Sequence, residues 1–574
     1  MSSQAIGATS RTCSVTGLKV DRSAERLIKV NAVVAIVMFL IGVTAAVMLV
    51  LTRWQAVHLL PADWYYRMLT AHGLNMLIFF IIFFEIAVLY FAGVVMLNSR
   101  FPAPWLGWTA FALMVGGAGL VEIMVFSGKA DVLFTSYVPL RADPLYYLGI
   151  ILFAVGALVG VMLFFAALVV ARREKTYEGS LPLVTFGALT AAIIAVVTLV
   201  HGAAVYIPTF FWSMDMMEMD PEVYRLLFWA LGHSSQQINV AAMVAIWYLL
   251  AGLTVGGVVL SEKVSRIAFG LYVLFISMAS AHHLLVDPGF SPAWKIWNTS
   301  YAMYLAVLAS LIHGFTVPAG VEMGQRLRGY NKGLFEWITR APWGDPGFSG
   351  LVLSVVIFGF LGGITGVTLG TEQINILAHN TLRITGHFHA TVVGGTALAF
   401  MAVTYYVIPL IFRKEVAFFS LAKWQPYLFG SGITIFSISF ILQGMFGVPR
   451  RHWDASFRDA PFAVEFPPVV DVLMTTMAIG GILAITGALI FILVAVVSVF
   501  FGKPLTDAAI ANGTARVPQG VLKLPPQTYS EAKSAEAHAK GAPGTLVLVF
   551  IFLGLFVLYY FTNWKMLSQV WRIG

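Results

Sequence analysis

The sequence has very little charge and a single cysteine. Only 11% of its 574 residues are charged and 59% are hydrophobic, whereas roughly 25% of the residues in a soluble domain are charged. This composition excludes an ordinary soluble protein and predicts an integral membrane protein. Because Cys13 is the only cysteine, disulfides, iron–sulfur clusters, thiolate zinc sites and a dinuclear copper centre are excluded too. Any metal bound by this chain must rely on histidine.

The few charges are mostly positive, with a formal net charge of +8. Lysine and arginine at the cytoplasmic ends of membrane helices produce such an excess through topology and lipid headgroups. We therefore expect the lipid bilayer to be the anionic partner and expect no nucleic acid.

Thirteen long apolar stretches predict an all-α, polytopic membrane protein, since about 20 apolar residues span a bilayer. The predicted spans are 29–52, 68–97, 105–127, 143–171, 183–207, 223–257, 265–285, 297–322, 347–370, 385–412, 422–445, 470–501 and 545–568. An odd number of spans places the two termini on opposite sides of the membrane. Most of the 35 Lys and Arg residues fall on the inner side if the N-terminus is cytoplasmic, which is the orientation we predict.

The spans divide the chain into four predicted parts. Residues 1–28 form a cytoplasmic N-terminal segment, because the apolar run after it is too long for a cleaved signal and predicts a retained helix. Residues 29–501 form a twelve-helix core and 502–544 a cytoplasmic linker rich in Ala, Pro, Gly and Lys. Residues 545–574 form the thirteenth helix and the C-terminus.

Six histidines fall at similar depth in the outer half of the predicted bundle. A single buried histidine is usually just a hydrogen-bonded core residue, and histidine inside a membrane is costly. Unrelated histidines would scatter in depth, so one shared layer indicates a metal or cofactor layer. The six are His72, His233, His282, His283, His387 and His389.

The spacing of His387 and His389 is informative because residues two apart on a helix point about 200° apart. These two histidines therefore cannot easily bind one metal, but they can each bind one of two haems from opposite faces of their helix. His72 can supply the second axial ligand of one haem, giving a six-coordinate electron-transfer haem. His233 with the adjacent pair His282 and His283 suits copper or iron.

The sequence resembles the core subunit, subunit I, of the haem–copper oxidase superfamily, and most closely its B-type branch. The motifs that carry the resemblance are AHGLNML around His72, LFWALGH ending at His233, AHHLLVDPGFSPAWK from Ala281, AHNTLRITGHFHA from Ala378 and GVPRR ending at Arg451. The resemblance covers nearly the whole chain.

The resemblance implies a set of ligands. It makes His72 and His389 the ligands of a low-spin haem b, and His387 the proximal ligand of a high-spin haem of b or a type. It makes His233, His282 and His283 the ligands of one copper, called copper B. The haem propionate region would be formed by Arg450, Arg451, His379 and Asn380; a headgroup anchor is the alternative role of the two arginines.

One position departs from the oxidases of this branch. They carry a tyrosine four residues after the first copper ligand, covalently joined to that ligand, whereas this chain reads GHSSQQINV with Gln237 at the position. In the family mechanism the tyrosine supplies the fourth electron that splits dioxygen, and glutamine cannot do so. Some relatives supply a tyrosine from the next span, but Tyr272 lies ten residues, about 15 Å, before His282.

Nitric oxide reduction needs only two electrons and two protons, which two reduced metals can provide without a radical side chain. Nitric oxide reductases of the superfamily also lack the tyrosine, and some have a metal-binding glutamate where this chain has Gln237. An amide is a poor iron ligand but can donate a hydrogen bond to developing negative charge, so copper is favoured over iron. We therefore predict a respiratory oxidoreductase of denitrification that reduces two NO to N2O.

Three alternatives stay open: a B-type terminal oxidase reducing O2 to water, an NO dismutase forming N2 and O2, and a noncatalytic gas-binding membrane protein. Measuring the consumption of NO and O2 and the gases that are formed distinguishes the three alternatives. The loss of a metal ligand would favour the noncatalytic protein, and every ligand position of the family is kept.

Proton transfer is expected to differ from the family pattern. The sequence keeps Tyr248 and Ser310 of the family's inner-half path, has Val244 where a second tyrosine is expected, and has His313 in place of a threonine. Glu85, 13 residues inward of His72, is a further candidate because intramembrane carboxylates are commonly functional.

The resemblance also implies partners and a location. Because the chain has no site for a dinuclear copper or c-type haem, electrons would enter through a membrane-anchored cupredoxin-like subunit II, fed by cytochrome c or a small copper protein. The expected location is the cytoplasmic (inner) membrane of a bacterium or archaeon.

The departure at Gln237 gives a first prediction. The substitution Gln237→Tyr alone should leave O2 reduction at its low wild-type rate, because the covalent link to the histidine ring and the proton supply are also missing. Oxygen consumption by the purified variant, with the wild-type complex as control, measures this. Rapid O2 turnover by the variant would contradict it.

Overall fold

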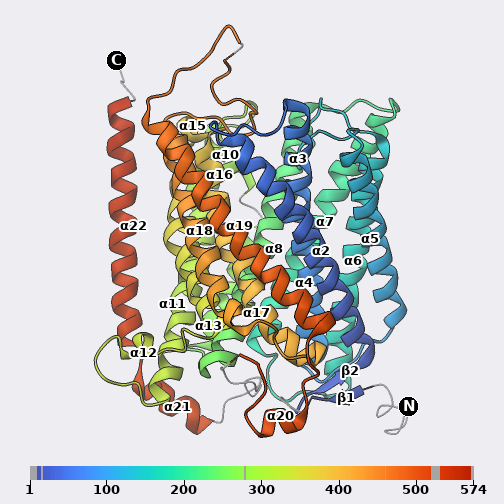
Figure 1. Cartoon of the computed structure of the whole chain (residues 1–574), viewed down its shortest axis with the longest axis vertical. Helices are drawn as coiled ribbons and strands as arrows, with labels where there is room; N and C mark the ends of the chain where they lie inside the picture. The colour runs from blue at the N-terminus through green and yellow to red at the C-terminus, as the bar shows by residue number, and fades with distance from the viewer. Residues whose placement is uncertain (1–9, 14–16, 277–279, 459, 519–530, 571–574) are drawn as a thin grey trace.

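The computed structural model describes residues 10–13, 17–276, 280–458, 460–518 and 531–570. Within them the chain is a bundle of roughly aligned helices, as predicted (Figure 1). Twelve helical stretches are long and apolar enough to cross a membrane. They span Arg22–Arg53, Ala62–Val95, Pro104–Phe126, Pro144–Arg173, Leu183–Ser213, Pro221–Val255, Pro292–Leu327, Pro346–Leu369, Leu382–Phe412, Phe419–Met445, Val469–Phe501 and Pro543–Met566.

Seven of these stretches are single α-helices. They are α2 (Arg22–Arg53), α5 (Pro104–Phe126), α6 (Pro144–Arg173), α7 (Leu183–Ser213), α8 (Pro221–Val255), α18 (Phe419–Met445) and α19 (Val469–Phe501). A further one, α22 (Pro543–Val570), lies at the edge of the bundle, and only 11% of its most apolar window is buried.

The other four stretches alternate between α-helical and wider π-helical segments. Their parts are α3 (Ala62–Leu74), η1 (Asn75–Phe79), α4 (Phe80–Tyr90) and η2 (Phe91–Val95); α10 (Pro292–Ile296), η5 (Trp297–Ala302) and α11 (Met303–Leu327); α13 (Pro346–Val356), η6 (Ile357–Gly363) and α14 (Ile364–Leu369); α16 (Leu382–Phe388), η7 (His389–Ala397), α17 (Leu398–Val407) and η8 (Ile408–Phe412). Such π segments are frequent at functional sites.

The predicted span 265–285 differs from the other spans. Its described residues form α9 (Glu262–Leu271), the π segment η3 (Tyr272–Ile276) and the short 3-10 helix η4 (Ser280–His283), while 277–279 lie outside the described residues. It is therefore not among the twelve long helices.

The remaining elements are short. They are the antiparallel strands β1 (Ser10–Thr12) and β2 (Lys19–Asp21), with α12 (Glu336–Thr339), α15 (Glu372–Ala378), α20 (Asp507–Ala511) and α21 (Glu531–Lys540). The small hairpin was not predicted, and α2 starts at Arg22 rather than near residue 29. The reason is local, because the side chain of Asp21 accepts a hydrogen bond from the Ala24 N–H and caps the helix before the apolar run begins.

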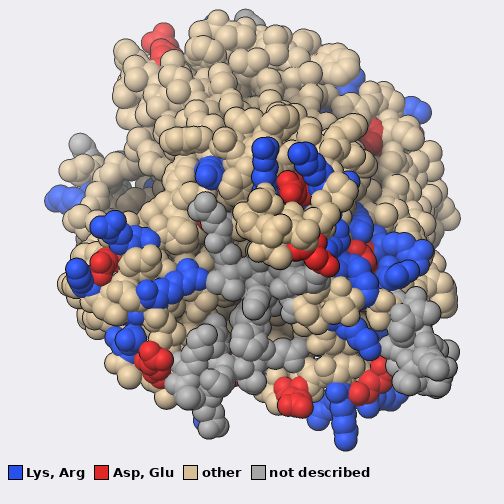
Figure 2. Space-filling view, turned by 60° about the horizontal axis from the view of Figure 1, so that its bottom comes forward, with Lys and Arg blue, Asp and Glu red and all other residues tan. Residues whose placement is uncertain are grey.

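The hairpin and the outer end of α22 lie at opposite ends of the bundle, as an odd number of crossings requires (Figure 1). Figure 2 shows the end that carries the hairpin, where many Lys and Arg side chains gather. Cytoplasmic ends of membrane bundles carry such an excess of Lys and Arg, and the orientation of this chain stays a prediction.

A buried carboxylate fixes the start of α22. The Glu322 side chain on α11 is fully buried and accepts hydrogen bonds from Gly544 N at 3.0 Å, Thr545 N at 2.6 Å and Thr545 Oγ1 at 2.7 Å. Arg326, one turn along α11, donates to the same carboxylate at 2.8 Å. Two otherwise unpaired N–H groups of a helix N-terminus and one cation thus satisfy the acid.

This contact predicts a large effect on stability. Glu322→Ala leaves Arg326 buried without its carboxylate, which typically costs about 3–5 kcal/mol, and should clearly lower the thermal unfolding midpoint of the purified protein in detergent. The matched control is Glu262→Ala, which removes the exposed i,i+4 pair with Arg266 and should cost at most about 1 kcal/mol. Equal effects of the two substitutions would contradict this account of α22.

Candidate metal and haem centre

All six histidines of the predicted layer line one cavity of about 590 Å³ in the middle of the bundle. Its walls are mainly apolar and come from most of the long helices. The same cavity is lined by Gln237, Glu85, Ser310, His379, Arg450 and Arg451, whereas Asn380, Tyr248 and His313 lie outside its lining. The structure therefore brings most of the predicted site together.

His72 and His389 face each other across part of this cavity. Their rings are nearly parallel, at 10°, with centroids 6.4 Å apart. Two imidazoles on opposite sides of one iron, with iron–nitrogen distances of about 2 Å, place their centroids about 6 Å apart. The pair therefore fits the two axial ligands of a six-coordinate haem.

Backbone carbonyl groups set the direction of these rings. His72 Nδ1 lies 3.0 Å from Gly42 O on α2, and His389 Nδ1 lies 2.8 Å from Thr385 O one turn earlier. A hydrogen bond at Nδ1 fixes the ring and leaves Nε2 as the ligand atom.

His387 is held in the same way but toward a different element. Its Nδ1 lies 3.0 Å from Gly362 O in the π segment η6 and 3.0 Å from Thr365 Oγ1. A side-chain Cβ at Gly366 would lie only 2.9 Å from the ring, so glycine there makes room for the imidazole. The ring of His389 contacts Phe436 on α18 instead, so the two histidines serve different parts of the cavity.

His233, His282 and His283 form a compact cluster. One ligand nitrogen from each lies within 4.8 Å of the others, and His233 Nδ1 is 3.1 Å from His283 Nε2. Two neutral nitrogens at that distance fit a shared positive ion, so the three residues suit one metal. His233 lies on α8, and His282 and His283 lie on η4.

Gln237 is buried beside this cluster. Its side chain is 8% exposed, and its Nε2 lies 3.5 Å from His233 Nε2. Its Oε1 is buried with no hydrogen-bond partner among the described residues. The amide thus occupies the face of α8 that also carries His233, as expected for residues four apart.

Sequence reasoning missed Trp229, which stacks on a cluster histidine. The rings of Trp229 and His283 are parallel within 7° with centroids 4.0 Å apart, and Trp229 Nε1 donates to Tyr137 Oη at 2.7 Å. Its position one turn before His233 was the available signal. Tyr272 turns elsewhere, with its hydroxyl 3.0 Å from Ser310 Oγ.

The predicted propionate region is a concentration of positive charge. Arg450 donates to Asn380 Oδ1 at 3.0 Å, and the guanidinium of Arg451 lies over the rings of Phe134 and Tyr137. Asn380 thus positions Arg450 rather than lining the cavity.

Neither arginine forms an ion pair with a carboxylate of the described residues; Asp287 nearby is engaged by Arg225. Burial first, and then Arg451, lower the pKa of Arg450 to about 9. Burial and then Arg450 lower the pKa of His379 to about 4. These buried donors without a counter-charge fit the carboxylates of haem propionates.

The proton-transfer candidates fall into separate groups. Tyr248 Oη lies 3.0 Å from Ser265 Oγ, 3.0 Å from His313 Nδ1 and 2.6 Å from Thr316 Oγ1. Ser310 instead pairs with Tyr272 and lines the cavity. Sequence reasoning missed two of these partners, Ser265 on α9 and Thr316 on α11.

Comparison with known proteins identifies the family. Residues 26–483 match the family model described as cytochrome c and quinol oxidase polypeptide I. Cytochrome c oxidase subunit 1 of Thermus thermophilus is 31% identical over 437 residues, covering 75% of each chain. Quinol oxidase subunit 1 of Bacillus subtilis is 23% identical over 72% of this chain and 64% of its own length.

A solved structure has a similar fold. It is described as a heme-copper terminal oxidase dimer and has a TM-score of 0.79 and 24% identity, covering 93% of this chain and 92% of the other.

The geometry of the facing pair gives a prediction. His72→Ala should remove the six-coordinate low-spin haem, and so reduce the haem content from two per chain to one, because one axial ligand is lost. Electron paramagnetic resonance and haem quantitation measure this. His201→Ala is the control, since His201 bonds to Val197 O on its own helix and does not line the cavity. Retention of the low-spin signal in His72→Ala would refute the assignment.

Proposed function

The chain belongs to the cytochrome c and quinol oxidase polypeptide I family, and from this premise we propose that it is the catalytic subunit of a nitric oxide reductase. The observation that carries the proposal is Gln237, which lies against His233 where oxidases of the branch that the chain resembles have a tyrosine. The proposed reaction is 2 NO + 2 e⁻ + 2 H⁺ → N2O + H2O.

The reductions of O2 and of NO differ in the number of electrons that they need. Reduction of O2 to water takes four electrons, and in the family mechanism a single-step cleavage takes the fourth electron from an oxidisable side chain, which is a tyrosine in the oxidases. A carboxamide has no comparable oxidation. Reduction of two NO molecules takes two electrons, so the amide at residue 237 removes nothing that this reaction needs.

Haems and a second metal, when bound, supply the electrons and the Lewis-acid site of the reaction. We propose that His72 and His389 hold a low-spin haem b, that His387 holds a high-spin haem of b or a type, and that Arg450 binds propionate. His233, His282 and His283 hold the second metal. Copper suits three imidazoles and a neutral amide better than iron, which favours a carboxylate as well.

The chain's own contribution to the chemical step is the amide of Gln237. Its nitrogen lies beside His233 and its oxygen has no partner among the described residues. The side chain can therefore turn either a donor or an acceptor toward the gas-binding space. A donor there stabilises negative charge as the N–N bond forms, and the absence of bulk water strengthens that contact.

The cavity walls fit a small uncharged substrate. The electrons need a source outside this chain. The cavity walls between α4, α6 and α7 are almost wholly apolar, with residues such as Ile81, Ala157 and Ala191. We propose that electrons come from a membrane-anchored cupredoxin-like subunit II, supplied by cytochrome c or a small copper protein. The complex would reside in the cytoplasmic membrane of a bacterium or archaeon with the N-terminus inside.

One observation favours reduction of O2 as a second candidate function. Trp229 stacks on His283 and is hydrogen-bonded to Tyr137, so an oxidisable aromatic pair touches the metal cluster. Trp229 could supply the electron that Gln237 cannot. The oxidase names of the relatives point the same way.

The two candidates are distinguished by the gas consumed. With a controlled electron donor, we expect the purified complex to convert labelled NO to one N2O per two electrons and to consume O2 far more slowly. The control is His283→Ala, which should lose the metal and both activities. Rapid four-electron O2 reduction with little N2O would refute the proposal, and a Trp229→Phe variant that loses this O2 reduction would then support the second candidate.

A further inference from the structure

A carboxyl group inside the membrane lines the same cavity as the metal cluster. Glu85 lies on α4, 13 residues after His72, and is only 6% exposed. Gln237 and His233 line the same cavity. The acid therefore lines the same cavity as the residues of the proposed gas-binding site.

Glu85 has no cationic partner among the described residues. An unpaired carboxylate in such surroundings is costly, and intramembrane carboxyl groups are commonly functional. We therefore expect Glu85 to hold its proton while the enzyme rests. Glu322 differs, because Arg326 lies beside it.

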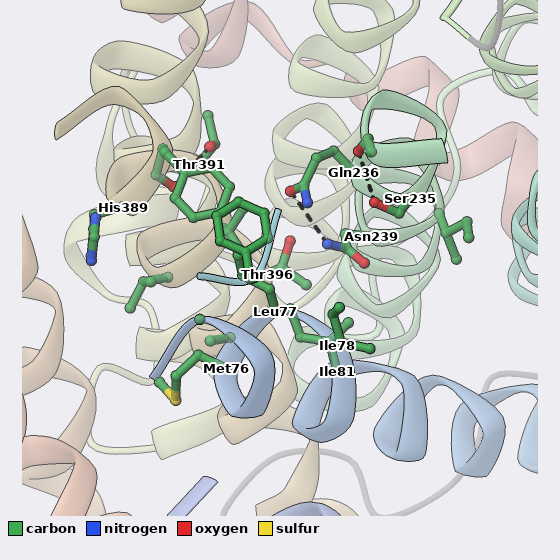
Figure 3. Close-up of a pocket in the computed structure, with 18 of the residues that line it drawn as sticks. Met76, Leu77, Ile78, Ile81, Ser235, Gln236, Asn239, His389, Thr391 and Thr396 are labelled. Atoms are coloured by element: carbon green, nitrogen blue, oxygen red, sulfur yellow. Dashed lines mark hydrogen bonds between the residues drawn. The ribbon is translucent and has the colours of Figure 1, made fainter. Parts of the chain in front are cut away.

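The polar partner of Glu85 is Asn239 on α8, two residues past Gln237. With its amide nitrogen turned toward the acid, Asn239 donates to Glu85 Oε1 at 2.9 Å and to Ser235 O at 3.3 Å. With the amide turned the other way, as drawn in Figure 3, the nitrogen faces Gln236 Oε1 at 3.5 Å. The first orientation gives the better hydrogen bonds.

Asn239 thus connects the acid to a polar strip on an otherwise apolar wall. Figure 3 shows Ser235, Gln236 and Asn239 gathered on α8, facing the apolar side chains of Leu77, Ile78 and Ile81. Water entering the cavity would find its hydrogen-bond partners along this strip. Asn239 lies six residues past His233, a rise of about 9 Å along the axis of α8, and both residues line the cavity.

We propose that Glu85 delivers the protons of the reaction and that Asn239 positions it. The inference rests on the proposed function for the identity of the substrate. For each N2O formed, one oxygen leaves NO as water and takes up two protons. Glu85 gives up its proton through water on the α8 strip, becomes a carboxylate, and is reprotonated from solvent before the second transfer, while the two electrons come from the external donor.

The hydrogen-bonded group around Tyr248 is a poorer source. Neither Tyr248 nor His313 lines the cavity, and Val244 stands where the family pattern would have a further hydroxyl. His313 Nε2 is buried without a hydrogen-bond partner among the described residues. This group therefore stops short of the cavity, whereas Glu85 reaches it.

The test compares two buried carboxyl groups in the intact complex. Glu85→Gln should lower steady-state NO turnover by about 100-fold, a typical contribution of one proton donor, and leave reduction of the haems by the donor unchanged. Glu122→Gln is the matched control, because Glu122 bonds to Asn75 at 2.6 Å and does not line the cavity. Glu85→Asp should restore part of the turnover.

Infrared difference spectra add a readout independent of activity. Reduction of the wild-type complex should change the C=O band of a protonated carboxylic acid. That band should vanish in Glu85→Gln, persist in Glu122→Gln and shift in Asn239→Leu, which removes the hydrogen bond. A band that Asn239→Leu leaves unmoved would refute the positioning role of Asn239.

The outcomes separate this inference from the proposed function. Normal NO turnover in Glu85→Gln, or an equal loss in Glu122→Gln, overturns the role of Glu85 and leaves the nitric oxide reductase intact. If the wild-type complex reduces O2 instead of NO, the proposed function fails. A selective loss of O2 turnover in Glu85→Gln would then still uphold Glu85 as the proton donor.

Discussion

The centre of this protein depends on backbone carbonyl groups that hold imidazole rings by their Nδ1 atoms. Gly42, Thr385 and Gly362 each place a carbonyl oxygen 2.8–3.0 Å from a histidine Nδ1. In a bilayer the carbonyls of a regular helix are already used within that helix. The ring of His387 is held by a carbonyl of the π segment η6, and the π segment η7 begins at His389. Irregular helix geometry and ring orientation are thus linked at His387, whereas Gly42 and Thr385 accept from within the α-helices α2 and α16.

The facing pair of histidines and the cluster of three histidines differ in how their rings are held. The facing pair His72 and His389 is set by contacts from other residues and fits a single arrangement. The cluster of three imidazoles is set partly by its own members, and its neighbours are Gln237 and the stacked Trp229. In the proposed function the chemistry is therefore decided around this cluster, where Gln237 lies beside His233.

Three sets of ionisable side chains inside the bundle differ in their surroundings. Glu322 is fully satisfied by Arg326 and by the start of α22, so it holds a peripheral helix in place. Arg450 and Arg451 have no carboxylate partner among the described residues and so suit an anionic ligand. Glu85 has an amide for a partner and no cation, which suits a group that gains and loses a proton.

The sequence by itself determined the membrane fold, the gathering of six histidines in one layer and the different directions of His387 and His389. These follow from the length of apolar runs and from the 100° step between helical residues, which are properties of a single helix. It did not reveal the β hairpin or the break in the span 265–285. The tertiary structure decided three further contacts. They are the stack of Trp229 on His283, the hydrogen bond of Asn239 to Glu85, and the hydrogen bonds from the start of α22 to Glu322. Each joins side chains from different elements, and the distance between elements depends on packing across the whole bundle rather than on periodicity along one helix.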